Sequence, residues 1–87
     1  MQDVNTVTWS KKAQKQLLKL SAQEALVIYD RVDDLKNFPD CQNVKRLITH
    51  RYGYRLRVGR YRVLFDHDSE IKVISIEEVK KRDERTY

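Results

Sequence analysis

The stretch that decides the fold is YRLRVGRYRVLF, residues 54–65, in which apolar and charged side chains alternate around a glycine. Successive side chains of a β-strand point to opposite faces, so a period of two indicates strands. The residues predicted to face the core are Tyr54, Leu56 and Val58 before the glycine and Tyr61, Val63 and Phe65 after it. Gly59 marks a turn, and a connection this short makes the two strands antiparallel.

The opposite face of this strand pair carries Arg55, Arg57 and Arg62. Arginine is planar and always charged, and it makes bidentate contacts with phosphate. Arg55 and Arg57 are separated by about 7 Å along a strand, which is close to the spacing of successive phosphates. Like charges so near each other repel, and an anionic ligand would relieve that repulsion. The alternative interpretation is a solvated basic edge with the tyrosines in the core.

Upstream of this stretch, the sequence predicts one strand and two helices. Residues 6–9 are β-branched and aromatic, which favours a strand. Ser10 is a predicted N-cap of the first helix. Ser21 and Glu24 fit a capping box at the start of a second helix, which Pro39 ends. The two helices are joined almost directly, so we expect an antiparallel hairpin.

Downstream, residues 66–69 are predicted to form a hairpin loop, residues 71–76 a central strand, and residues 79–87 a charged tail. The expected fold is α+β, with an N-terminal strand, an antiparallel helical hairpin on one face of a mostly antiparallel three- to four-stranded sheet, and a short C-terminal tail. Two helices cover only one face of such a sheet, which leaves the arginines on the other.

Composition sets further limits. The 87 residues, with 40% hydrophobic and 36% charged side chains, suit a single domain over residues 1–87. Residues 1–10 show no signal-peptide pattern, and no apolar run approaches the roughly 20 residues of a membrane span. The single cysteine, Cys41, cannot form an internal disulfide, so we expect a cytoplasmic protein. With only His50 and His67 besides, no metal site and no cofactor are expected.

The charge is unevenly distributed along the chain. Residues 1–44 hold six basic and six acidic side chains, whereas residues 45–87 hold twelve basic and seven acidic ones, which gives the net charge of +5. This asymmetry favours a polyanionic partner, nucleic acid before a membrane surface. The alternative is a basic face that only aids solubility.

Other candidate groups carry weaker signals. His50 lies in a predicted loop and His67 in a predicted turn, where a structural role is expected. Cys41 has no neighbour in the sequence that would activate a thiol. The pairs Asp33-Asp34 and Glu77-Glu78 are expected to be solvated or salt-bridged rather than a general acid/base dyad.

The order of elements, the segment GYRLRVGRYRVLF (residues 53–65) and the ending ISIEEVKKRDERTY (residues 74–87) resemble the RelE/ParE superfamily of toxins from bacterial toxin–antitoxin pairs. The resemblance covers nearly the whole chain. It implies one of two activities: the RelE branch comprises ribosome-dependent mRNA endonucleases, and the ParE branch inhibits DNA gyrase without a comparable catalytic cluster.

By the RelE pattern, Arg55 and Arg57 match basic positions on the strand that meets the scissile phosphate, and Arg62 matches an arginine that stabilises charge on it. The implied reaction is attack by the RNA 2′-OH on the adjacent phosphate, giving a cyclic phosphate and a free 5′-OH without a metal. Arginine is a poor general base, so either another residue is the base or the arginines act only electrostatically.

The same resemblance assigns roles to the C-terminal residues. Arg82, or Lys81 if the gap falls differently, matches a proton donor to the leaving oxygen, and Tyr87 matches a tyrosine that stacks on a base of the cut codon. Further RNA contacts are expected from Arg51, Arg60, Lys81 and Arg85.

The sequence thus predicts a type II toxin that cleaves mRNA in the ribosomal A site. Its expected partners are a cognate antitoxin protein and the 70S ribosome with its mRNA and rRNA, with no membrane and no small-molecule cofactor. The alternatives are a ParE-like gyrase inhibitor without catalysis and a non-toxic RNA-binding module.

Overall fold

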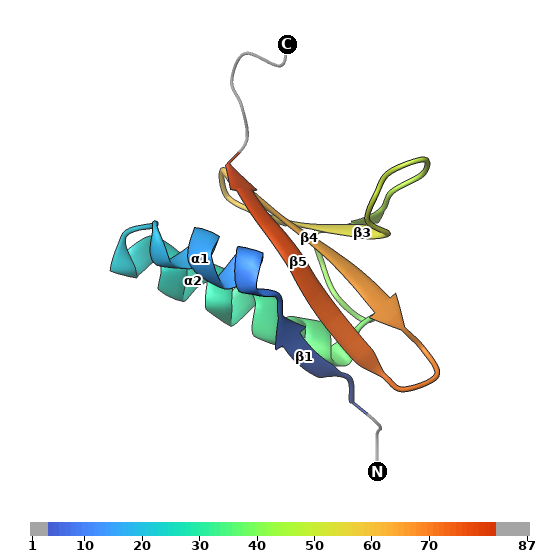
Figure 1. Cartoon of the computed structure of the whole chain (residues 1–87). Coiled ribbons are helices and arrows are strands. Elements are labelled where there is room, and N and C mark those ends of the chain that lie inside the picture. Colours follow the sequence, from blue (N-terminus) through green and yellow to red (C-terminus); the bar gives the residue numbers. More distant parts are fainter. Residues whose placement is uncertain (1–3, 82–87) are drawn as a thin grey trace.

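The structure, a computed structural model, describes residues 4–81 as two helices, a short 3₁₀ helix and one five-stranded sheet (Figure 1). In chain order the elements are β1 (Thr6–Trp9), α1 (Lys11–Leu18), α2 (Ala22–Asp33), η1 (Asp34–Asn37), β2 (Val44–Arg46), β3 (Tyr54–Val58), β4 (Tyr61–Asp68) and β5 (Val73–Lys81). The strand order across the sheet is β1-β5-β4-β3-β2. The α+β class is confirmed.

The prediction of three to four strands was wrong, because the sheet has five. The unexpected strand is β2, which pairs antiparallel with β3. Its three residues, Val44–Arg46, are too few to show an alternating pattern in the sequence. The sheet is also mixed: β1 lies parallel to β5, while the other neighbouring strands are antiparallel.

The last hairpin lies further along the chain than the sequence predicted. Strand β4 continues through Asp68, so residues 69–72 rather than 66–69 form the turn. Strand β5 then continues to Lys81, so residues 79–81 belong to the sheet and not to a tail. The polar residues Asp66 and Asp68 hide the extension of β4 from a search for apolar alternation, and the acidic pair Glu77-Glu78 hides the extension of β5.

The helices begin where the sequence predicted. The Ser10 hydroxyl accepts a hydrogen bond from the Ala13 amide at 3.0 Å, and the Ser21 hydroxyl accepts one from the Glu24 amide at 3.2 Å. In the capping box, Glu24 bonds the Ser21 hydroxyl at 3.1 Å, in place of the Ser21 amide that we expected. Both helices lie on one side of the sheet (Figure 1). The hydrophobic core lies between the helices and the sheet. It is formed by Ala13, Ile28, Val32, Leu35, Leu56, Val58, Tyr61, Val63, Phe65, Ile74, Ile76 and Val79.

Helix α1 also closes the edge of β5. Strand β1 pairs only with residues 73–76, so the rest of β5 has no neighbouring strand on that side. There the Val79 amide donates to Gln16 Oε1 at 2.6 Å, and the Ser10 hydroxyl donates to the Glu77 carbonyl at 2.9 Å. Side chains of α1 and its cap thus replace the hydrogen bonds of a missing strand.

A β-bulge at Glu77 reverses the alternation of β5. Ile76 pairs with Phe65 and Glu78 pairs with Leu64, which leaves Glu77 as the extra residue. Before the bulge Ile76 faces the core, and after it Val79 does. The side chains of Glu78 and Lys80 therefore lie on the face away from the helices.

Candidate nucleic-acid interface

Strands β3 and β4 place Arg55, Arg57 and Arg62 on the face of the sheet opposite the helices. Arg57 and Arg62 are directly paired across the two strands, and Arg55 pairs with Leu64. The tyrosines of the same strands face the core, as predicted: the Tyr54 ring stacks on Phe65 at 5.4 Å between centroids. The sequence pattern thus located the three arginines together.

The burial of these arginines leaves hydrogen-bonding capacity unused. Arg57 is exposed, whereas Arg55 and Arg62 are half-buried. The Nε atoms of Arg55 and Arg62 are buried and have no hydrogen-bond partner among the described residues. A buried donor without an acceptor costs about 1–3 kcal/mol, so an anionic oxygen bound here would remove an existing penalty.

Two lysines extend the arginine cluster across the sheet. Lys45 on β2 pairs with Arg55, and Lys80 on β5 pairs with Arg62. We call the surface formed by Lys45, Arg55, Arg57, Arg62 and Lys80 the cationic face. Neighbouring strands lie about 4.8 Å apart, and like charges placed directly opposite each other destabilise a sheet. The arrangement therefore has a cost that a bound polyanion would offset.

Glu78 is an acidic side chain that lies against the cationic face. It is only 7% exposed, and its carboxylate contacts Lys12 Nζ of α1 at 3.0 Å and Lys80 Nζ at 3.7 Å. Burial raises the pKa of Glu78, but the hydrogen bond from Lys12 and the charges of Lys80, Lys12 and Arg51 outweigh burial and leave the pKa below its ordinary value. Glu78 is therefore a charged, salt-bridged carboxylate, as expected for one member of its acidic pair.

Of the other predicted RNA contacts, Lys81 and Arg60 lie away from the cationic face, whereas Arg51 is near enough for its charge to lower the pKa of Glu78. Lys81 pairs with Tyr61, whose hydroxyl donates to Glu24 of α2, so Lys81 projects on the helix side of the sheet. Arg60 lies in the exposed turn between β3 and β4. Arg51 lies in the loop before β3, with its guanidinium 5.5 Å from the centre of the Tyr52 ring.

The predicted roles of Arg82, Arg85 and Tyr87 fall on residues outside the described range of 4–81. These assignments stay predictions.

The sequence reasoning did not identify Lys45 or Lys80 as members of the cationic face, nor Lys12 as the ion-pair partner of Glu78 beside it. A period of two through Ile74 and Ile76 places Lys80 on the core side and Lys81 with the arginines. The bulge at Glu77 reverses that order. A signal was available in the pair Glu77-Glu78, because a buried strand that keeps strict alternation would carry Glu78 into the core.

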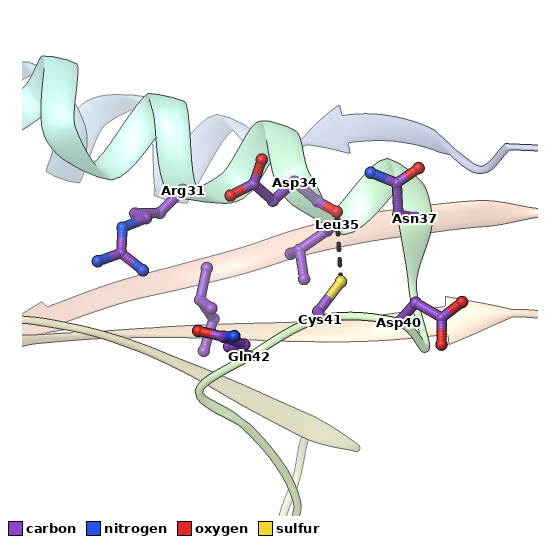
Figure 2. Close-up of a pocket in the computed structure, with 8 residues that line it drawn as sticks. Arg31, Asp34, Leu35, Asn37, Asp40, Cys41 and Gln42 are labelled. Atoms are coloured by element: carbon purple, nitrogen blue, oxygen red, sulfur yellow. Dashed lines mark hydrogen bonds between the residues drawn. The ribbon is translucent and has the colours of Figure 1, made fainter.

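Cys41 lies in a cavity of about 210 Å³ between η1 and the connector to β2 (Figure 2). Its thiol donates to the Asp34 carbonyl at 3.2 Å, as the dashed line in Figure 2 shows. Burial, with smaller contributions from the charges of Asp34 and Asp40, raises the pKa of the thiol. A raised pKa disfavours the thiolate, which agrees with the expectation that Cys41 is not a nucleophile.

Each histidine contacts neighbouring groups within the fold. His67 lies on β4 rather than in a turn, where its Nε2 is 3.2 Å from Asn5 Oδ1 and its ring contacts Phe38 edge-on at 4.9 Å. His50 Nδ1 accepts a hydrogen bond from the Tyr52 amide at 3.0 Å. Within residues 4–81, no three His, Cys, Asp or Glu side chains are grouped to hold a metal ion, and no helix is long and apolar enough to cross a membrane.

Comparison with known proteins identifies the family of the chain and finds solved structures with the same fold. Residues 7–86 match the family model of the ParE toxin of the type II toxin–antitoxin system parDE. The fold is similar to the toxin–antitoxin complex RelBE2 from Mycobacterium tuberculosis, with 26% identity, a TM-score of 0.78, and coverage of 91% of this chain and 99% of that chain. No curated protein sequence matches.

Two further solved structures share the fold. The archaeal RelE–RelB complex from Pyrococcus horikoshii is 27% identical, with a TM-score of 0.79 and coverage of 93% of this chain and 98% of that chain. The isolated RelE toxin of E. coli is 15% identical, with a TM-score of 0.78 and coverage of 94% and 88%. The protein is therefore a toxin of the RelE/ParE superfamily. It belongs to the ParE toxin family of type II toxin–antitoxin systems.

Proposed function

We propose that this toxin is a metal-independent endoribonuclease that enters the ribosomal A site and cleaves mRNA. The observation that carries the proposal is the convergence of Arg55, Arg57 and Arg62 on one face, with the Nε donors of Arg55 and Arg62 unpartnered among residues 4–81. A ParE-type inhibitor that acts only by binding gyrase does not require this concentration of phosphate-directed donors.

In the proposed reaction the cationic face holds the scissile phosphate and neutralises its developing charge. Arg62 donates to the non-bridging oxygens, and Arg55 and Arg57 align the backbone on either side. The bond from the 2′-oxygen to phosphorus forms as the bond from phosphorus to the 5′-oxygen breaks. The guanidinium groups stay protonated, so the proton of the 2′-OH passes to another base or to water.

The leaving 5′-oxygen requires a proton donor at the end of β5. Because Lys81 pairs with Tyr61 on the helix side, we assign this role to Arg82 rather than to Lys81. The proton that Arg82 gives to the 5′-oxygen is replaced from water, so Arg82 ends the step as a guanidinium. Tyr87 is proposed to stack on a base of the codon.

The proposed protein partner follows from the solved relatives, and the proposed RNA partners follow from the cationic face. The solved relatives from M. tuberculosis and P. horikoshii are complexes of RelE with RelB proteins. We therefore propose a cognate antitoxin for this chain, together with the 70S ribosome, its mRNA and its rRNA.

The second candidate function is inhibition of DNA gyrase, which the ParE family model favours. In that case the cationic face contacts acidic protein or DNA and performs no chemistry.

The deciding experiment runs both assays on the full-length purified protein. One reaction contains 70S ribosomes programmed with an end-labelled mRNA, with cleavage mapped by primer extension. The other contains gyrase and relaxed plasmid. Codon-aligned cuts that appear only with ribosomes, in EDTA-treated protein as well, support the endonuclease. Loss of supercoiling without any cut overturns it in favour of the gyrase inhibitor.

A further inference from the structure

Helix α1 contributes to the edge of the cationic face in a way that the arginine pattern does not predict. Lys12, in the first turn of α1, contacts Glu78 Oε1 at 3.0 Å, and Lys80 of β5 contacts Glu78 Oε2 at 3.7 Å. One buried carboxylate thus joins two lysines from elements far apart in the sequence. The three side chains have a combined charge of +1, and they border the arginines because Lys80 pairs with Arg62.

Both lysines keep donors free for another ligand. Each lysine side chain is 57% exposed, while the whole Glu78 side chain between them is 9% exposed. An ammonium group has three donors, so one contact to Glu78 leaves two for solvent or a ligand. The two lysines therefore present their positive charge to solvent, while the negative charge of Glu78 stays below the surface.

The position of Lys12 is unfavourable for α1 itself. The N-terminal turn of a helix carries a partial positive charge and favours acidic residues, yet the first turn of α1 contains none. A lysine here does not stabilise the helix, so its ion pair with Glu78 is the feature that holds it in place.

We propose that Lys12 and Lys80 form a second phosphate-binding site of the toxin, continuous with the arginines, and that Glu78 is the positioning residue that holds both lysines. The ligand is a backbone phosphate of single-stranded RNA next to the one bound by Arg62. This inference rests on the proposed RNA-directed function but adds α1 and Glu78 to the binding surface.

The test measures binding of a single-stranded, fully 2′-O-methylated RNA, which cannot be cleaved by 2′-OH attack, over a range of KCl concentrations. Each phosphate contact adds about 0.7 to the slope of log K against log salt, or about fivefold in affinity at 0.1 M salt. We expect Lys12→Gln and Lys80→Gln each to lose about that much slope and affinity. Lys19→Gln removes the same charge at the other end of α1 and serves as the matched control, with an unchanged slope.

The positioning role is tested by a double-mutant cycle. In a Glu78→Gln background, which keeps the shape of the side chain, the effect of Lys12→Gln should shrink by about twofold or more towards that of Lys19→Gln. An undiminished effect overturns the role of Glu78. If Glu78→Gln does not fold, the slopes of the exposed single variants still decide whether the lysines bind phosphate.

The outcome is separable from that of the proposed function. Slope losses at Lys12 and Lys80 without any ribosomal cleavage keep the binding site and overturn the nuclease. If the toxin cleaves mRNA but its Lys12 and Lys80 variants bind RNA like Lys19→Gln, the nuclease is kept and the second phosphate site is overturned. A wild-type protein that binds no RNA overturns the inference.

Discussion

At the scale of single residues, truncation of the Arg62 side chain should affect mRNA cleavage without affecting the fold. Its side chain lies off the core, between Arg57 and Lys80. Arg62→Ala should reduce ribosomal mRNA cleavage by about 10²- to 10³-fold, the usual effect of deleting one donor to a developing anion. Arg55→Ala and Arg57→Ala should weaken it less. Single-turnover cleavage on programmed ribosomes measures the effect.

The control for this series is Arg31→Ala, since Arg31 is exposed on α2, on the other side of the sheet. All variants should keep the wild-type circular dichroism spectrum and melting temperature to within a few degrees. Equal cleavage by the wild type and all three cationic-face variants would contradict the nuclease mechanism and favour gyrase inhibition.

Tyr87 is the second residue whose role can be separated into parts. Stacking on a base is worth about 1–3 kcal/mol, or roughly 5- to 150-fold in rate. Tyr87→Phe keeps the ring and should retain most cleavage, whereas Tyr87→Ala should lose it. If Phe is as damaging as Ala in the same ribosome assay, the hydroxyl is required and stacking alone is not the role. If Tyr87→Ala cleaves mRNA as fast as the wild type, the role proposed for Tyr87 is wrong, and the role proposed for Arg82 loses its support.

At the scale of elements, α1 stabilises the sheet by replacing a strand at its edge. Gln16 accepts from the Val79 amide at 2.6 Å, and Val79 is only 6% exposed. Gln16→Ala leaves that amide buried without a partner, which should lower the free energy of unfolding by about 1–3 kcal/mol. Gln14→Ala, which removes only an exposed bond to the Trp9 carbonyl, should cost a few tenths at most. Urea unfolding followed by circular dichroism compares the two, and equal costs would refute this role for α1.

The elements also show where sequence reasoning succeeds and where it fails. Alternation in residues 54–65 predicted two strands, their core face and the three arginines, because every position outside the turn at residues 59–60 has a direct cross-strand partner. Local rules also located the caps at Ser10 and Ser21. Alternation alone did not locate the bulge at Glu77, since the bulge depends on how β5 packs against both β4 and α1 and its one local signal is the acidic pair Glu77-Glu78. The salt-bridged state of Glu78 was predicted, but the position of Glu78 and Lys80 on the face of the arginines was missed.

At the scale of the whole molecule, the uneven charge predicts how an antitoxin silences the toxin. The net charge of +5 lies wholly in residues 45–87, and this half of the chain also holds all five members of the cationic face. We expect the antitoxin to lay a helix or strand on the sheet or the helical hairpin, with carboxylates near the arginines. Its affinity should fall as salt rises and should drop in the Arg62→Ala variant. A complex structure that leaves both surfaces uncovered would contradict this expectation.

The charge of the whole chain also predicts how stability responds to acid. The pKa of Glu78 is lowered against the effect of burial by Lys12, Lys80 and Arg51, and the pKa of Glu24 is lowered by hydrogen bonds from Tyr61 and Ser21. A carboxyl whose pKa is lower in the folded state stabilises the fold above its unfolded pKa of about 4.3, and this stabilisation is lost as pH falls through the folded pKa. The basic excess then repels itself without opposing charge. Urea midpoints measured from pH 7 to pH 3 should therefore fall steeply below about pH 4.5 in the wild type and less steeply in Glu78→Gln. Glu70→Gln, the same change in the exposed turn before β5, is the control and should follow the wild type; parallel curves for all three proteins would show that the ion pairs of Glu78 do not contribute to the fold.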